Sequence, residues 1–269
     1  METNIDFKLG KEIEWLELNL LKNNRPMSKS QISNLASGAD EDDVDSWLSE
    51  LAKRSILYKD PIYTVSNNKV KPNYNWKDIP EYFLCLFYSF YGANDYSGGT
   101  NLFEKISANA LKNFINGEIY TLGFPARLNF NQHLDEIAKC CSEQRGMPAN
   151  NSYKDDGVDV LGVKSFGDNR SSNLYILLQC AAGRHWTAKK PIILNRWTNY
   201  IVWYPENLIQ SISTVEFVEQ KDWDKHSSTF GMLLDRIRIY NFLYKTGIDQ
   251  LLRDEISIWC EMKIKSGLQ

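Results

Sequence analysis

The sequence predicts an α/β protein in which a mainly helical module precedes a domain of mixed strands and helices. Apolar residues recur at helical spacing through much of the first 75 residues. From residue 129 onward the order becomes helix, strand, strand and helix, with turn residues between them. The chain has 269 residues, 43% of them hydrophobic, which is enough for one large domain or two modest ones.

Segment 1–75 is expected to form three helices and a hairpin. Ser28 or Ser30 can cap the second helix, which Gly38 would end, and a third helix would follow Asp40. Alternating apolar and polar residues after that helix predict a short sheet. Three helices and a hairpin resemble a winged helix-turn-helix.

The third helix of such a module usually reads DNA, with its N-terminal turn in the major groove. Here that turn is acidic, and phosphates would repel it. We therefore favour a protein-contact or dimerisation module over a DNA reader. The acidic residues are Asp40, Glu41, Asp42, Asp43 and Asp45.

Segment 76–128 is interpreted as a helical connector packed on the core. Its run IPEYFLCLFYSFYGA is apolar on nearly all sides, as expected of a buried helix, and LFEKISANALKNFI is amphipathic. The run GEIYTLGFPARLNF, which holds Gly123 and Pro125, is interpreted as a connector.

Segment 129–269 is expected to carry the chemistry, because a polar pair lies on two of its predicted strands. Asp159 lies inside the predicted strand GVDVLGVKSF, and a carboxylate there needs a partner. The next strand, LYILLQCA, ends near Gln179, so both side chains can emerge at one end of the sheet. With the backbone carbonyl of Cys180, these oxygens suit a hard cation such as Mg²⁺.

The run GVDVL, a hairpin and then ILLQC resembles the Mrr-type branch of the PD-(D/E)xK nucleases, the restriction-endonuclease-like superfamily. The resemblance covers roughly residues 129–200 and implies a central mixed sheet flanked by helices. It makes Asp159 the first ligand of Mg²⁺ or Mn²⁺ and Gln179 the second. Many members add a glutamate from the helix before the first strand, and Glu136 takes that position here.

The lysine that usually follows two residues after the second ligand is missing, because Ala181 stands there. Either the lysine has migrated to Lys189 or Lys190, or the site has decayed into a binding module. We favour migration, and Lys190 over Lys189, with the small residues 181–183 forming a floor beneath the lysine.

Several residues outside these motifs are further candidates for a functional role. Arg184, Arg236 and Arg238 are candidate nucleic-acid contacts, although Arg236 and Arg238 could equally make structural salt bridges. His185 is a minor candidate for a general base, and the Cys180 thiol is interpreted as a buried core group rather than a nucleophile.

Composition and charge exclude several classes. The formal net charge of −3 gives no whole-molecule argument for binding nucleic acid. No apolar run is long enough to span a bilayer, and the N-terminus lacks the order of a signal peptide. The five cysteines show no CxxC spacing, so we expect reduced thiols in a cytoplasmic protein without a structural zinc site.

The expected function is therefore a Mg-dependent DNA endonuclease, a phosphodiester hydrolase, in a restriction or anti-phage defence system. The alternative is an inactive nuclease-fold adaptor that scaffolds a partner or binds DNA. A helicase, an ATPase or another defence-system subunit is the expected partner, no membrane contact is expected, and a homodimer is left open.

Overall fold

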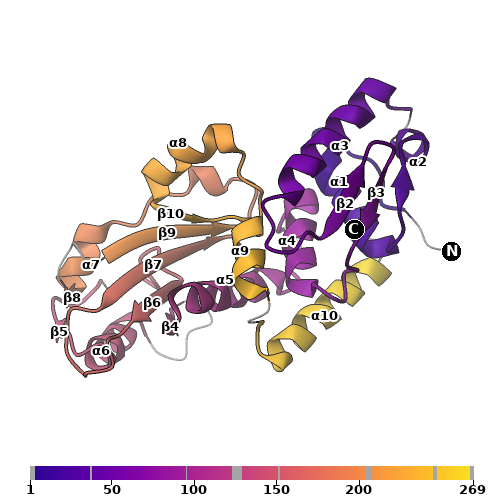
Figure 1. Ribbon diagram of the computed structural model, residues 1–269. Coiled ribbons are helices and arrows are strands. Elements are labelled where there is room, and N and C mark those ends of the chain that lie inside the picture. The colour runs from indigo at the N-terminus through magenta and orange to yellow at the C-terminus, as the bar shows by residue number, and fades with distance from the viewer. Residues whose placement is uncertain are drawn as a thin grey trace. The chain divides into compact units, whose positions relative to one another are not determined.

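The computed structural model describes residues 4–36, 38–94, 96–122, 129–150, 152–203, 208–244 and 247–266. The chain divides into two compact units, one of Met1–Leu102 with Arg236–Gln269 and one of Phe103–Asp235 (Figure 1). The segment boundaries expected from the sequence do not coincide with these units, because the C-terminal helices belong to the first unit.

The first unit contains the three helices and the hairpin that the sequence predicts. A capping box between Ser28 and Gln31 starts the second helix, and the Asp40 carboxylate caps the third. The short strand β1 was not predicted; it pairs with β3 and makes a three-stranded antiparallel sheet of order β1-β3-β2. The elements are α1 (Glu12–Asn23), β1 (Met27–Ser28), α2 (Lys29–Leu35), α3 (Glu41–Ser55), β2 (Tyr63–Ser66), β3 (Lys69–Pro72), α4 (Pro80–Tyr91), α9 (Arg236–Leu243) and α10 (Gln250–Lys265).

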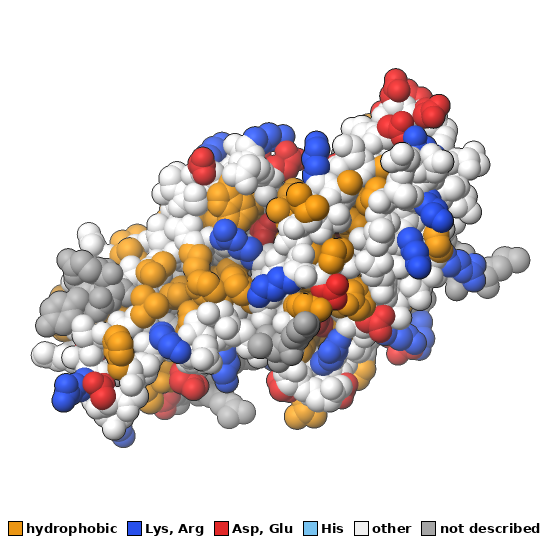
Figure 2. All heavy atoms as spheres, in the orientation of Figure 1, with side chains coloured by type: hydrophobic (Ala, Val, Ile, Leu, Met, Phe, Trp, Pro, Cys, Tyr) orange, Lys and Arg blue, Asp and Glu red, His pale blue; other side chains and the backbone are white. Residues whose placement is uncertain are grey.

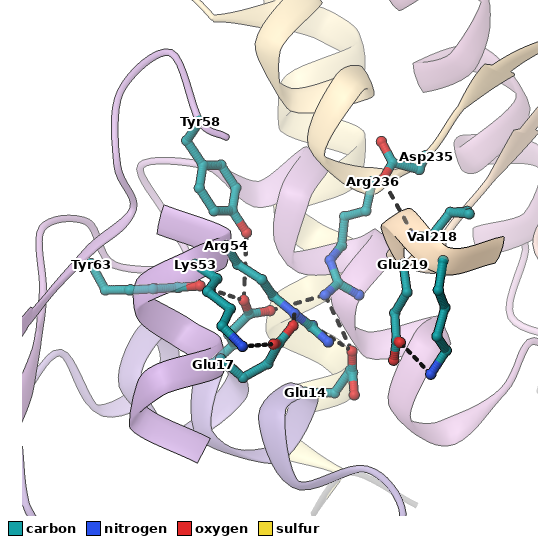
Figure 3. A network of polar contacts seen from close by, with 12 residues as sticks. Glu14, Glu17, Lys53, Arg54, Tyr58, Tyr63, Val218, Glu219, Asp235 and Arg236 are labelled. Atoms are coloured by element: carbon teal, nitrogen blue, oxygen red, sulfur yellow. Dashed lines mark hydrogen bonds and ion pairs between the residues drawn. The ribbon is translucent and has the colours of Figure 1, made fainter. Parts of the chain in front are cut away.

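A buried charge network holds the core of the first unit together (Figure 3). The Arg236 guanidinium, only 1% exposed, lies 3.0 Å from Glu17 and 3.5 Å from Glu14. Arg54 is 3.0 Å from Glu14. Although burial opposes ionisation of Glu14, Arg236 and Arg54 lower the pKa of its carboxyl to about 2.

This network corrects the prediction that Arg236 contacts nucleic acid. Its side chain is enclosed by protein and satisfied by carboxylates and by the Tyr82 hydroxyl, so it cannot reach a phosphate. A short strand ends at Leu234, and Arg236 begins the helix α9. The buried carboxylate Asp235 accepts a hydrogen bond from the Val218 amide.

The second unit is built on a five-stranded mixed sheet of order β10-β9-β7-β6-β4 (Figure 1). The β4, β6 and β7 strands pair antiparallel, whereas β7, β9 and β10 run parallel. The elements are α5 (Gly99–Ile115), β4 (Glu118–Thr121), α6 (Phe130–Cys140), β5 (Gln144–Arg145), β6 (Val160–Lys164), β7 (Leu174–Ala181), the 3₁₀ turn η1 (Trp186–Ala188), α7 (Leu194–Tyr200), β8 (Ile201–Val202), β9 (Leu208–Thr214), α8 (Gln220–Phe230) and β10 (Met232–Leu234).

Helices pack on the sheet of the second unit. A side chain at Gly162 of β6 would come within 2.8 Å of Leu111 on α5, so the glycine lets this helix approach closely. Leu134 of α6 and Trp197 of α7 join a second cluster with Leu177 of β7. The expected α/β architecture, a central mixed sheet flanked by helices, is therefore confirmed.

The strand β4 corrects the interpretation of residues 117–130 as a connector. Its four residues pair with β6, but both ends are exposed and its middle is only half-buried, so the sequence shows no clear apolar alternation. Gly123 and Pro125 lie outside the described residues. The first strand of the sheet thus follows α5 rather than α6.

Two exclusions made from the sequence can be compared with the structure. None of the five cysteines forms a disulfide. Within the described part of the chain, no helix combines the length and apolar character needed to cross a membrane.

Removing one partner of the buried network will destabilise the first unit strongly. We expect Glu17→Ala to lower the free energy of unfolding by about 3–5 kcal/mol, because it leaves Arg236 buried with only part of its compensation. Urea unfolding measures this loss. The matched control is Glu50→Gln, which alters a partly exposed partner of Arg54 and should cost about 0–1 kcal/mol. Equal losses in the two variants would contradict the network's structural role.

Candidate active site

The turn before β6 delivers Asp159 to the end of the sheet. The Asp155 carboxylate accepts a hydrogen bond from the Gly157 amide at 2.8 Å, and Gly157 has a φ of +81°, a conformation that favours glycine. Asp156 is tied to Arg196 by an ion pair and to the Tyr200 hydroxyl at 3.0 Å. Asp155 and Asp156 therefore shape the turn that aims Asp159.

Asp159 and Gln179 emerge at the same end of two neighbouring strands, as the sequence predicts. Val160 pairs with Leu178, so Asp159 lies beside Gln179. Asp159 immediately precedes β6 and is not inside the strand as expected, whereas Gln179 is within β7. The Cys180 amide donates to Asp159 Oδ2 at 2.6 Å and fixes the carboxylate. Gln179 Oε1 is buried and accepts no hydrogen bond from any described residue.

Glu104, on α5, is the residue that the sequence reading missed. Burial, together with the neighbouring charges of Asp159 and Asp155, raises the pKa of its carboxyl to about 7, while Lys189 opposes these effects. The signal was present in the sequence, because Glu104, Ser107 and Leu111 share one helical face, and Leu111 packs on the sheet.

The Asp159 carboxyl responds to the same environment. Burial is the largest influence and raises its pKa; the Cys180 amide and Lys189 lower it, and Asp155 raises it. Two half-buried carboxyls thus lie within electrostatic reach of each other and of one lysine.

That lysine is Lys189, not the preferred Lys190. Its ammonium donates to the Cys180 carbonyl at 2.9 Å, nine residues back along the chain. Lys190 is exposed and does not contribute to the charge effects on Glu104 or Asp159. The single turn η1 ends at Ala188, and Pro191 favours extended backbone at Lys190, the residue before it.

The structure does not show the small residues after Gln179 as the floor beneath the lysine that the sequence suggested. Ala181 and Ala182 are buried, and Ala181 packs in a cluster with Trp186, the first residue of η1. A longer side chain at Ala181 would enter this cluster rather than the site. Gly183 faces open space, so its lack of a side chain has no steric cause.

The structure does not bring Glu136 to these residues. It is exposed on α6, and its charge does not contribute to the pKa shift of the Asp159 or the Glu104 carboxyl. The resemblance asks for a glutamate on the helix before the first strand, and once β4 is recognised as that strand, this helix is α5. Glu104 on α5 is thus a helix glutamate close to Asp159, whereas Glu136 is not.

The remaining candidates lie outside this cluster. Arg184, Arg238 and His185 are exposed, so contacts of these residues with nucleic acid or substrate stay predictions. Burial raises the pKa of the Cys180 thiol well above its usual value, which keeps it protonated and agrees with its interpretation as a core group.

The side-chain oxygens of Asp159, Glu104 and Gln179 are the atoms here that could bind a divalent cation. Among the described residues, no three His, Cys, Asp or Glu side chains are grouped closely enough to hold a metal ion. A cation here would depend on the Asp159 and Glu104 carboxylates together with neutral oxygens. The unpartnered Oε1 of Gln179 is such an oxygen, and carboxylate and amide oxygens are ligands that Mg²⁺ accepts, so the residues fit a cation.

Comparisons of the chain with protein-family models, with curated proteins and with solved structures gave no match. These comparisons therefore show no family for the chain. What supports a function is the chemistry of the site together with the resemblance of its two strand motifs.

The charge environment of Glu104 predicts a pH-dependent stability. Its folded pKa is raised from 4.5 to about 7, so between these values the native state holds a proton that the unfolded state has lost. Stability should therefore fall as pH rises through this window. Glu104→Gln removes the titration, so we expect it to stabilise the protein relative to wild type at about pH 8 and not at about pH 4.

Urea unfolding at the two pH values measures the difference. Glu136→Gln is the matched control, since it makes the same change on an exposed helix position and should show no pH-dependent gain. A Glu104→Gln effect that is the same at both pH values would contradict the raised pKa.

Proposed function

We propose that the protein is a metal-dependent DNA endonuclease that hydrolyses phosphodiester bonds with Asp159, Gln179, Glu104 and Lys189. The observation that carries this proposal is the convergence of Asp159, Glu104 and Lys189 beside an unpartnered amide oxygen. Buried like charges are costly unless a cation compensates them, and one exposed lysine compensates them only in part.

Each residue has a role that follows from its surroundings. Asp159, held by the Cys180 amide, and Glu104 would bind Mg²⁺ or Mn²⁺ with the Gln179 amide oxygen. The bound cation would polarise a phosphate oxygen and lower the pKa of a water molecule. The Lys189 ammonium would stabilise negative charge that develops on the phosphate.

The architecture supports the nuclease proposal. A central mixed sheet flanked by helices is what the resemblance to the restriction-endonuclease-like superfamily implies. The order of helix glutamate, strand aspartate and strand glutamine is kept when Glu104 takes the helix position. Fold alone does not decide activity, so the proposal rests mainly on the site.

The first unit is proposed as a protein-contact module rather than a DNA reader. Acidic side chains gather at the N-terminal end of α3, the helix that would enter the major groove (Figure 2). Phosphates would be repelled there. We therefore propose that DNA reaches the nuclease through a partner such as a helicase, an ATPase or another subunit of a restriction or anti-phage system in the cytoplasm.

One observation favours the alternative of an inactive adaptor. Ala181, at the usual lysine position, is 1% exposed and packs with Trp186, so the family's lysine cannot be restored there without repacking. If Lys189 does not act on a phosphate, the unit would only scaffold a partner or bind DNA.

A plasmid-cleavage assay with Mg²⁺ or Mn²⁺ tests the proposal. We expect Asp159→Ala to abolish cleavage, since it removes a carboxylate that would hold the cation. Lys189→Met should lower the rate about 100-fold or more, the order of loss seen when one charge-stabilising donor is removed.

The adjacent Lys190→Met is the matched control and should cleave like the wild type, because Lys190 lies outside the cluster. Cleavage that survives Asp159→Ala would refute the site. Absence of cleavage under all metal conditions, with DNA as linear, plasmid and single-stranded substrate, would favour the adaptor.

A further inference from the structure

The hydrogen bond between Lys189 and Cys180 holds an ammonium next to the residues that would bind a divalent cation. The Lys189 ammonium donates to the Cys180 carbonyl at 2.9 Å, although its side chain is exposed and has water as an alternative partner. The same carbonyl belongs to the residue whose amide fixes Asp159. The lysine is thus held against the rim of the acidic cluster.

Local structure keeps Lys189 in this place. Trp186 is buried against Ile212 and Phe230, which anchors η1, and the Lys189 amide closes that turn on the Trp186 carbonyl at 3.1 Å. The side chain therefore starts from a fixed point, and only its flexible stem must move for the ammonium to leave the carbonyl.

Acidic groups near Lys189 explain why its ammonium stays at the Cys180 carbonyl. Glu104 and Asp159 are the carboxyls on which it acts, and Asp155 adds a third acidic group nearby. An ammonium and a divalent cation repel each other at short range, so this cluster holds each of them more weakly when the other is close. Binding of one must weaken binding of the other, and this coupling is reciprocal.

We propose that Lys189 is an internal counter-ion of the site, and that a divalent cation binds by displacing its ammonium from the Cys180 carbonyl. The inference rests on the proposed function, because it assumes that the site takes a divalent cation. Displacement frees the Lys189 ammonium to reach the phosphate only when the divalent cation is bound. Without the metal, the ammonium stays at the Cys180 carbonyl and balances the charge of the Glu104 and Asp159 carboxyls.

Direct measurement of Mn²⁺ binding by the full chain tests this device without any need for activity. We expect Lys189→Met to bind Mn²⁺ at least about fivefold more tightly than the wild type, in calorimetry or by the loss of the free Mn²⁺ resonance signal. Lys190→Met removes the same charge one residue away and should stay within about twofold of the wild type, because exposed charges are screened by salt. Lys189→Arg keeps the charge and should resemble the wild type.

The outcomes separate this inference from the proposed function. Equal or weaker Mn²⁺ binding by Lys189→Met overturns the counter-ion role, while loss of cleavage in Asp159→Ala would still support the nuclease. Tighter binding by Lys189→Met supports the counter-ion role, even if no form of the protein cleaves DNA and the nuclease proposal fails. If no form binds millimolar Mn²⁺, the counter-ion role and the cation of the proposed function are both refuted.

Discussion

The antiparallel pairing of β6 with β7 is the constraint on which the candidate site depends. Since Val160 pairs with Leu178, Asp159 and Gln179 lie side by side where the pairing of β6 with β7 ends, and a slip by one residue would turn one of them to the opposite face. The parallel strand β9 fixes β7 from its other side. The site is therefore positioned by the most constrained strand of the second unit, with α5 adding Glu104.

The two units handle buried charge in different ways. In the first unit, Glu14 and Glu17 are matched by buried arginines at ion-pair distance, and the network is complete within the protein. In the second unit, the exposed Lys189 is the one counter-charge that acts on Glu104 and Asp159 among the described residues. The first arrangement is suited to stability, and the second leaves electrostatic free energy for a ligand to recover.

The sequence predicted what local patterns determine and missed what distant pairing determines. Asp159 and Gln179 could be placed together because a hairpin joins their strands within a short stretch of chain. Glu104 was missed because the edge strand β4 shows no alternation, which moved the expected helix glutamate to the wrong helix. Lys189 and Lys190 are adjacent, so the sequence did not show which ammonium returns to Cys180, and the buried carboxylate partners of Arg236 lie more than 200 residues away.

A double-mutant cycle of unfolding free energies tests most directly whether Glu104 and Asp159 share one electrostatic site. Glu104→Gln, Asp159→Asn and the double variant are unfolded in urea at about pH 8, above the raised pKa of Glu104, and at about pH 4, below it. Each single variant removes the same repulsion between Glu104 and Asp159. The change in the free energy of unfolding in the double variant should therefore be smaller than the sum of the two single changes, by about 0.5–3 kcal/mol at the higher pH. At the lower pH this difference should be much smaller. Additive effects at both pH values would contradict the shared site.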